Sequence, residues 1–190
     1  MFKESGVNGR DAKREAVLEA AQTLMLKHGL RGTSMEAIAR AAGIAKPTLY
    51  AHFADKQAVF AALVERLIET WRREFLAGFA GPGDVVERIG AALTNKHKAA
   101  MRLLASSPHA EELSGEHDRL TVPQFAAFEA EIAARIETEL AAAGAGRPRF
   151  ATQLLLAAAF GIGRKAQSPA ELGPALRLLA ERLLRPELPG

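Results

Sequence analysis

The chain of 190 residues contains no cysteine, one tryptophan and one tyrosine. The absence of cysteine excludes disulfides, thiol nucleophiles and zinc sites built on thiolates. The longest apolar run, residues 154–163, is far shorter than the roughly 20 residues that a membrane-spanning helix requires. The N-terminal stretch MFKESGVNGRDAKR has no apolar core of signal-peptide length. We therefore expect a soluble, cytoplasmic protein without a membrane partner.

Signals of strands, internal repeats and common catalytic motifs are also missing. The Gly144-Ala-Gly146 stretch is neither preceded by a strand nor followed by the third glycine of a dinucleotide-binding loop. No serine stands in the sequence context of a nucleophile elbow. We therefore expect an all-α protein that is not an enzyme and needs no cofactor.

What the chain does contain is a large share of hydrophobic residues, 48%, and an uneven distribution of charge. Residues 1–56 hold nine Lys and Arg against six Asp and Glu, whereas residues 57–190 hold sixteen of each. The net charge of +3 therefore lies wholly in the N-terminal part. An excess of basic residues is typical of surfaces that meet phosphate groups, although three charges alone decide little.

Residues 33–56, TSMEAIARAAGIAKPTLYAHFADK, predict two very short helices joined by a tight turn and followed by a longer helix. Thr33 or Ser34 can cap the first helix. Gly43 ends it, because the residue just past a helix end favours left-handed backbone angles. Pro47 suits the first turn of the second helix, where its missing N–H is not needed. This is the pattern of a helix-turn-helix.

The second short helix is expected to bury few of its side chains. Leu49 and Phe53, four residues apart, face inward, which leaves the cationic, polar and aromatic side chains between them exposed, as on a recognition helix. Lys46 can donate to guanine, and Thr48 can meet a thymine methyl group. Lys56, at the start of the next helix, is placed to contact a phosphate.

The order of these residues resembles the DNA-binding domain of tetracycline-repressor-like (TetR family) transcriptional regulators. The resemblance covers about residues 17–67, and its pattern is Gly-x-x-Gly-Thr-Ser-Met-x-x-Ile-Ala-x-x-Ala-Gly-Ile-x-x-Pro-Thr-Leu-Tyr-x-His-Phe-x-x-Lys. The family often has serine where this chain has Ala45 and glycine where it has Pro47, so Ala45 is left out of the candidate site. The candidate DNA-binding residues are Thr33, Ser34, Lys46, Pro47, Thr48, Tyr50, Ala51, His52 and Lys56.

The resemblance implies an all-α fold of about nine helices, with an N-terminal three-helix helix-turn-helix domain and a C-terminal helical domain. We place the DNA-binding domain at residues 1–56, with a mobile arm at 1–9, and the effector-binding and dimerisation domain at 57–190. Asp11, Asp55 and Asp84 are expected to open helices, since aspartate is a preferred N-cap residue. The family also implies a homodimer and a double-stranded DNA operator.

Large apolar side chains recur along the helices predicted after residue 56. The helix from about 56 to 80 would belong to both domains and, as a stiff rod, would pass movement at its far end to the helix-turn-helix. In the family, the C-terminal helices enclose an effector pocket, and the residues here favour an apolar or aromatic small-molecule effector. A simple core is the alternative. The candidate pocket residues are Trp71, Phe75, His97, Met101, Phe125, Phe128 and Phe160.

The stretch Leu154–Ile162, LLLAAAFGI, carries no polar side chain on any face. A helix that is apolar all round must be covered all round, so one face would pack in its own domain and the other against a second copy. The last two helices of both copies would form a four-helix bundle, as the resemblance also implies; a central helix of a monomeric core is the alternative. The candidate dimer-interface residues are Leu155, Ala159, Leu172, Leu176, Leu179 and Leu183.

Two other functions stay open at this point. A DNA-binding regulator gated by a protein partner would need no small-molecule effector. An all-α metal-dependent enzyme would use the acidic segment 109–118, where His109, Glu112 and Glu116 would share a helical face. Gly115 disfavours a continuous helix there, so we interpret the segment as a solvated turn without a metal. The preferred prediction is a repressor that a small effector releases from a palindromic operator.

Overall fold

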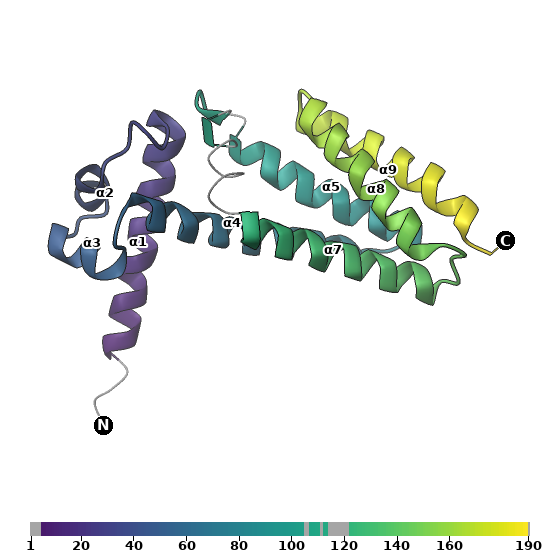
Figure 1. The fold of residues 1–190 in the computed structure, drawn as a ribbon, viewed down its shortest axis with the longest axis horizontal. Coiled ribbons are helices and arrows are strands. Elements are labelled where there is room, and N and C mark those ends of the chain that lie inside the picture. Colours follow the sequence, from purple (N-terminus) through teal and green to yellow (C-terminus); the bar gives the residue numbers. More distant parts are fainter. Residues whose placement is uncertain (1–4, 105–106, 111, 114–121, 190) are drawn as a thin grey trace. The chain divides into compact units, whose positions relative to one another are not determined.

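The computed structural model describes residues 5–104, 107–110, 112–113 and 122–189, and every regular element in these ranges is helical. This confirms the all-α fold. None of the described helices is long and apolar enough to cross a membrane. The elements are α1 (Ser5–His28), α2 (Met35–Ala41), α3 (Lys46–His52), α4 (Lys56–Phe79), α5 (Val85–Leu104), α7 (Val122–Ala142), α8 (Pro148–Lys165), α9 (Pro169–Leu184) and the short 3-10 helix η1 (Arg185–Glu187) (Figure 1).

The chain forms two compact units. The first unit comprises Met1–Leu67 together with Leu104–Val122, and the second comprises Ile68–Leu103 together with Pro123–Gly190. The first unit therefore extends past residue 56, where the sequence placed the domain boundary, and it takes up a stretch that follows α5. Helix α4 begins in the first unit and ends in the second without a break.

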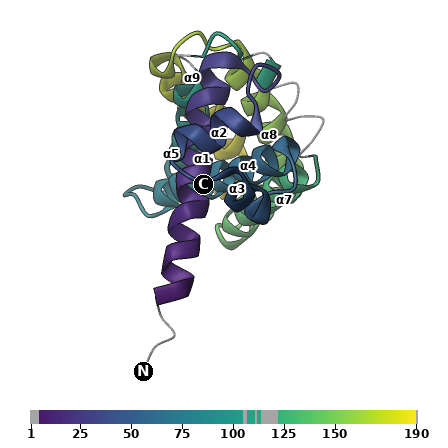
Figure 2. The same cartoon turned by 90° about the vertical axis from the view of Figure 1, so that its left-hand side faces the viewer.

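In the first unit, α2 packs against α1 and α3 packs against α2 (Figure 2). Helix α1 begins at Ser5 rather than at Asp11, so residues 5–9 of the predicted mobile arm are helical, while residues 1–4 lie outside the described residues. It ends at His28, because the next residue, Gly29, has a φ of 73°, which only glycine adopts without strain. The core of this unit contains Val17, Leu18, Ala21, Met25, Ile38, Leu49, Phe53, Val59, Phe60 and Leu63.

The second unit is built from the end of α4 and from α5, α7, α8 and α9. Asp84 opens α5 as predicted: its Oδ1 accepts the N–H of Val86 at 2.9 Å and of Glu87 at 3.0 Å, while the Glu87 carboxylate accepts the Asp84 N–H at 2.9 Å. This reciprocal capping box fixes the start of the helix. Helix α7 buries one apolar stripe, whose members are at most 1% exposed: Phe128, Ile132, Ile136 and Leu140. Phe125, one turn earlier, is half-buried.

Helices α8 and α9 form an antiparallel pair (Figure 1), and most of the predicted dimer-interface residues are buried. Leu155, Leu172 and Leu176 are completely buried and Ala159 is 1% exposed, so these four side chains are already covered within one protomer and offer a second copy almost no surface. Leu179 and Leu183 are half-buried. The physical reason is that a helix with apolar residues on every face does not reveal which face its own protomer covers.

Helices α8 and α9 also carry a different set of large apolar residues, which are exposed. Phe150, Leu154 and Phe160 of α8 and Leu178 of α9 are between 44% and 63% exposed. On α8, Phe150 and Leu154 are four residues apart and therefore neighbours on the helix surface, and Phe160 is about 80° around the helix from Phe150 at 3.6 residues per turn. We call the four residues the α8–α9 apolar face. Phe160, at 63% exposure, points to the surface, which does not fit its predicted place inside an effector pocket.

Candidate DNA-binding surface

Helix α2 begins and ends at residues that the sequence identified. The Ser34 hydroxyl oxygen accepts the N–H of Ala37 at 3.1 Å, so Ser34 rather than Thr33 is the N-cap. After Ala41 the chain turns at Gly43, whose φ is 67°. The Ile44 N–H then donates to the Ala39 carbonyl at 3.0 Å, which closes the helix end. The tight turn of the helix-turn-helix is therefore present.

Helix α3 buries one edge and displays the rest. Leu49 is completely buried and Phe53, the C-cap residue, is 5% exposed. The Arg14 guanidinium of α1 lies over the Phe53 ring, 5.6 Å from its centroid. Pro47 stands in the first turn, as predicted. The predicted DNA-facing side chains of this helix are exposed or half-buried: Lys46, Pro47, Tyr50 and Ala51 are exposed, and Thr48 and His52 are half-buried.

Lys46 has a partner in the structure that the sequence analysis did not anticipate. Its Nζ lies 2.9 Å from a carboxylate oxygen of Glu36 on α2, and 58% of its side chain is exposed. The hydrogen bond from Lys46 lowers the pKa of Glu36. An exposed pair of this kind contributes little to stability, so Lys46 can exchange Glu36 for another acceptor at small cost.

Thr33 and Lys56 face the protein rather than the solvent. The Thr33 side chain is 3% exposed, and its hydroxyl donates to the Gly29 carbonyl at 2.7 Å, so this side chain is not accessible to DNA. The Lys56 Nζ donates to the carbonyl of Leu30 at 2.6 Å and to that of Thr33 at 2.8 Å, with the carbonyl of Arg31 at 3.5 Å. A phosphate would have to compete with these acceptors for the ammonium group. We call residues 29–33 the α1–α2 turn.

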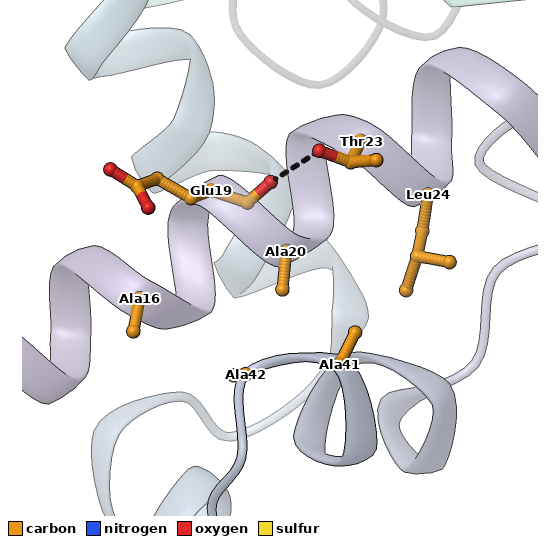
Figure 3. A pocket seen from close by; sticks show the side chains of 7 residues that line it. All are labelled: Ala16, Glu19, Ala20, Thr23, Leu24, Ala41 and Ala42. Carbon is orange, nitrogen blue, oxygen red and sulfur yellow. Dashed lines mark hydrogen bonds between the residues drawn. The ribbon is translucent and has the colours of Figure 1, made fainter.

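A groove lies between α1 and α2 in this unit, and none of its lining residues belongs to α3. It has a volume of about 320 Å³. Figure 3 shows why it exists: the residues facing each other are alanines, and the Thr23 hydroxyl is bonded to the Glu19 carbonyl at 3.0 Å instead of filling the space. Glu19 is its one ionisable lining residue. The lining residues are Ala16, Glu19, Ala20, Thr23, Leu24, Ala41 and Ala42.

The structure brings part of the predicted effector pocket together in the second unit. The rings of Trp71 and Phe125 meet edge to face with centroids 5.7 Å apart, and Phe125 meets Phe128 at 6.4 Å. Phe75 and Phe128 line a groove of about 150 Å³ between α4 and α7. Trp71, Phe75 and Phe128 are at most 9% exposed, so a packed core accounts for them as well as a pocket does.

The remaining candidates lie on α5. Met101 is half-buried, and so is His97. Burial, together with the charge of the neighbouring Lys96, lowers the pKa of His97 to about 3. Lys96 is itself 8% exposed and forms an ion pair with Glu129, with Nζ and oxygen 2.6 Å apart. His97 is therefore neutral at physiological pH and offers a hydrogen-bonding group without charge.

The described residues contain no group of three or more His, Asp or Glu side chains that could hold a metal ion. His109 and Glu112, from the acidic segment that the sequence left as an alternative, lie 3.4 Å apart between Nδ1 and Oε2. Glu116, the third member of that predicted face, lies outside the described residues. Glu112 instead accepts the backbone N–H of Arg31 at 2.9 Å, a contact that nothing in the sequence pattern signalled.

Comparison with known proteins adds to this geometry. The family model described as bacterial regulatory proteins, tetR family, matches residues 17–63, which contain α2, α3 and the start of α4. The transcriptional regulator RutR of Escherichia coli K12 is 30% identical over 127 residues, 60% of this chain and 60% of RutR. The transcriptional activator FasR of Mycolicibacterium smegmatis is 29% identical over 118 residues, 62% of this chain and 52% of FasR. The matches thus span only a little over half the length of these relatives.

Solved structures share the fold over nearly the whole chain. A TetR/AcrR-family regulator from Thermobifida fusca has a TM-score of 0.68 with 26% identity, and the match covers 88% of this chain and 95% of that one. The complex of SmeT with triclosan has a TM-score of 0.70 with 24% identity, covering 94% of this chain and 92% of SmeT. Taken with the helix-turn-helix at residues 33–56, these matches show that the chain belongs to the tetR family of bacterial regulatory proteins.

Proposed function

We propose that this protein is a DNA-binding transcriptional regulator that reads its operator with α3. The observation that carries the proposal is the display of Lys46, Tyr50 and Ala51 on α3, above a buried edge formed by Leu49 and Phe53. A short helix held in this way can enter the major groove, where base edges are distinguishable. Membership of the tetR family supports the same assignment.

Within this proposal the exposed side chains divide into two roles. Lys46 and Thr48, at the N-terminal end of α3, read bases, because the first residues of a recognition helix meet base edges. The hydroxyl groups of Ser34 and Tyr50 contact phosphates and so fix the orientation of the unit on DNA. To read a base, Lys46 first has to break its ion pair with Glu36. The phosphates of DNA would repel the Glu36 carboxylate, and a guanine in the major groove supplies new acceptors for the Lys46 ammonium group.

The regulator acts as a homodimer joined through the α8–α9 apolar face. Four large apolar side chains at 44% to 63% exposure are costly to leave in water, and a two-fold axis brings the same patch of both copies together. The dimer then presents two copies of α3 to one operator. A palindromic operator, with half-sites one or more helical turns apart, is the expected partner of such a dimer.

A small apolar or aromatic molecule that weakens operator binding is the proposed signal, which makes the protein a repressor. The cluster of Trp71, Phe125 and Phe128 in the second unit supports an aromatic ligand, and the similar fold of SmeT holds triclosan. Because α4 is continuous from Lys56 to Phe79, a ligand that displaces Trp71 or Phe75 moves a rod that starts directly after α3.

One observation favours a second candidate, a regulator gated by a protein partner. The groove beside Phe75 and Phe128 measures about 150 Å³, whereas pockets for small ligands are commonly about 300–1,000 Å³. Thermal-shift screening of the purified protein with apolar aromatic compounds, triclosan among them, separates the two. A ligand at 100 times its dissociation constant adds about 2.7 kcal/mol of stability, and the absence of any stabilising compound favours the protein partner.

The DNA-binding proposal is tested by selection from a pool of random double-stranded DNA. The wild-type protein should enrich a palindromic sequence, and the enriched duplex then serves as the operator in all binding assays. The Lys46→Ala variant should bind this duplex with relaxed preference at one base pair in each half-site, at a cost of roughly 1–3 kcal/mol for the preferred base. Recovery of no sequence at low salt would remove the proposed function.

A further inference from the structure

The chain enters the DNA-binding helix α2 through the α1–α2 turn. Within residues 29–33, the Thr33 N–H reaches the Leu30 carbonyl at 3.4 Å, which is a long bond, and the Thr33 hydroxyl reaches the Gly29 carbonyl at 2.7 Å. Helix α2 starts two residues after this turn, capped by Ser34. A shift of the turn therefore moves α2 and, through it, α3.

Contacts from a distant part of the chain hold the same region. The Glu112 carboxylate accepts the Arg31 N–H at 2.9 Å. The Ser107 hydroxyl donates to the Leu26 carbonyl, in the last turn of α1, at 2.8 Å. Leu113 is 7% exposed, so this segment is anchored by burial as well as by hydrogen bonds. All three residues follow α5 directly in the sequence and belong to the first unit.

The fit between Glu112 and the turn is close. A Cβ atom on Gly29 would collide with the Glu112 carboxylate, so glycine at this position serves both the left-handed backbone and the approach of the acid. Only 24% of the Glu112 side chain is exposed. A hydrogen bond to a carboxylate is stronger than one between neutral groups, and this one ends on the backbone of the turn itself.

We propose that Glu112 is a positioning residue for operator binding: its carboxylate holds the α1–α2 turn in the arrangement in which α2 and α3 fit DNA. The inference rests on the proposed DNA-binding function. Glu112 touches no DNA in this scheme and acts through the Arg31 backbone. Because Glu112 lies eight residues after the end of α5, a change at the C-terminal end of α5 has a short path along the chain to the DNA-binding helices.

The test compares Glu112→Ala with Glu112→Gln, using the duplex that the wild-type protein selects from a random pool. The alanine variant loses the acceptor, so the turn populates other arrangements, and apparent affinity falls with the competent fraction. We expect a loss of about tenfold for Glu112→Ala. Glu112→Gln keeps an oxygen that can accept the Arg31 N–H, so it should stay within about threefold of wild type. The slope of log affinity against log salt should be unchanged in both, since no phosphate contact is removed.

Two further measurements make the outcome decisive. Amide hydrogen exchange of Arg31 should speed up in Glu112→Ala but not in Glu112→Gln, a change that needs no DNA to be seen. Glu65→Ala, which removes an exposed glutamate of α4 in the same unit, controls for loss of one negative charge. If loss of one negative charge alone mattered, Glu65→Ala and both Glu112 variants would all bind DNA more tightly than wild type, and the inference would be wrong. The inference is also wrong if Glu112→Ala binds the operator as tightly as wild type does. A wild-type protein that selects no duplex would instead remove the proposed function.

Discussion

Replacing Lys56 by methionine removes its ammonium group while keeping most of the aliphatic chain. In the structure this group donates to the part-buried carbonyls of Leu30 and Thr33 at 2.6 and 2.8 Å. A hydrogen bond to a charged group contributes about 1.5–3 kcal/mol to stability. Water can hydrogen-bond to both carbonyls once the ammonium group is gone. We therefore expect the free energy of unfolding of the first unit to fall by about the contribution of one such hydrogen bond, about 2 kcal/mol.

The assay combines urea unfolding with the salt dependence of operator binding. If Lys56 mainly holds the α1–α2 turn, Lys56→Met lowers stability by about 2 kcal/mol and weakens operator binding without changing the log–log salt slope. Lys46→Ala is the matched control, because Lys46 is exposed and paired only at the surface with Glu36. Its stability should stay within about 0.5 kcal/mol of wild type.

The competing interpretation, which the sequence suggested, is a direct phosphate contact by Lys56. It predicts a salt slope flattened by about 0.9, the value for one lost phosphate contact on duplex DNA, and little change in stability. A Lys56→Met protein that is as stable as wild type and shows this flatter slope would refute the structural role. The two interpretations are distinguishable, because the loss of stability is measured without DNA, whereas the change in salt slope is measured with it.

Three further variants test other parts of the structure. The pKa of His97 is lowered to about 3 by burial, so the folded state excludes its proton; stability is complete above pH 6.5 and falls as pH drops from 6.5 toward 3. At pH 5 the loss should be about 2 kcal/mol, and His97→Asn should lose this part of the pH dependence in urea unfolding at pH 7 and pH 5. The double variant Phe160→Glu, Leu178→Glu should sediment as a monomer at micromolar concentration, whereas Leu76→Glu, an exposed leucine of α4, should not change the oligomeric state; a wild-type monomer would contradict the dimer proposal. Tyr50→Ala, at a side chain 48% exposed, should weaken operator binding without lowering the thermal midpoint, and an equal loss of stability would mean that Tyr50 supports the fold instead.

The helix-turn-helix was predictable because each of its features is local. A capping hydroxyl at Ser34, a glycine with a positive φ at Gly43 and a proline in the first turn at Pro47 act within a few residues of sequence. The inward side chains Leu49 and Phe53 follow from helical periodicity alone. These features fix the exposed edge of α3 before any tertiary contact is considered.

The proposed dimer face was not predictable in the same way. Every position from Leu154 to Ile162 is apolar, so the sequence shows that α8 is covered on all sides without showing by what. The protomer covers the side with Leu155 and Ala159, and it leaves Leu154 and Phe160 outside. Which side packs inward depends on how α8 lies against its neighbours, and that is a tertiary property.

For long charged side chains, the sequence can indicate that a residue is important without indicating which group it binds. The sequence predicted that Lys56 contacts a phosphate, yet its ammonium group donates to carbonyls of the α1–α2 turn. Glu112, which is 81 residues from Arg31 in the sequence, accepts the Arg31 N–H of the same turn. The Lys56 ammonium binds carbonyls of the α1–α2 turn and the Glu112 carboxylate binds one of its amides, so the two side chains hold the same turn from its acceptor and its donor groups. Neither side chain has to contact DNA to do so. Substitutions confined to α3 would therefore underestimate how much of the affinity for DNA depends on the α1–α2 turn, because the residues that hold it lie outside the recognition helix.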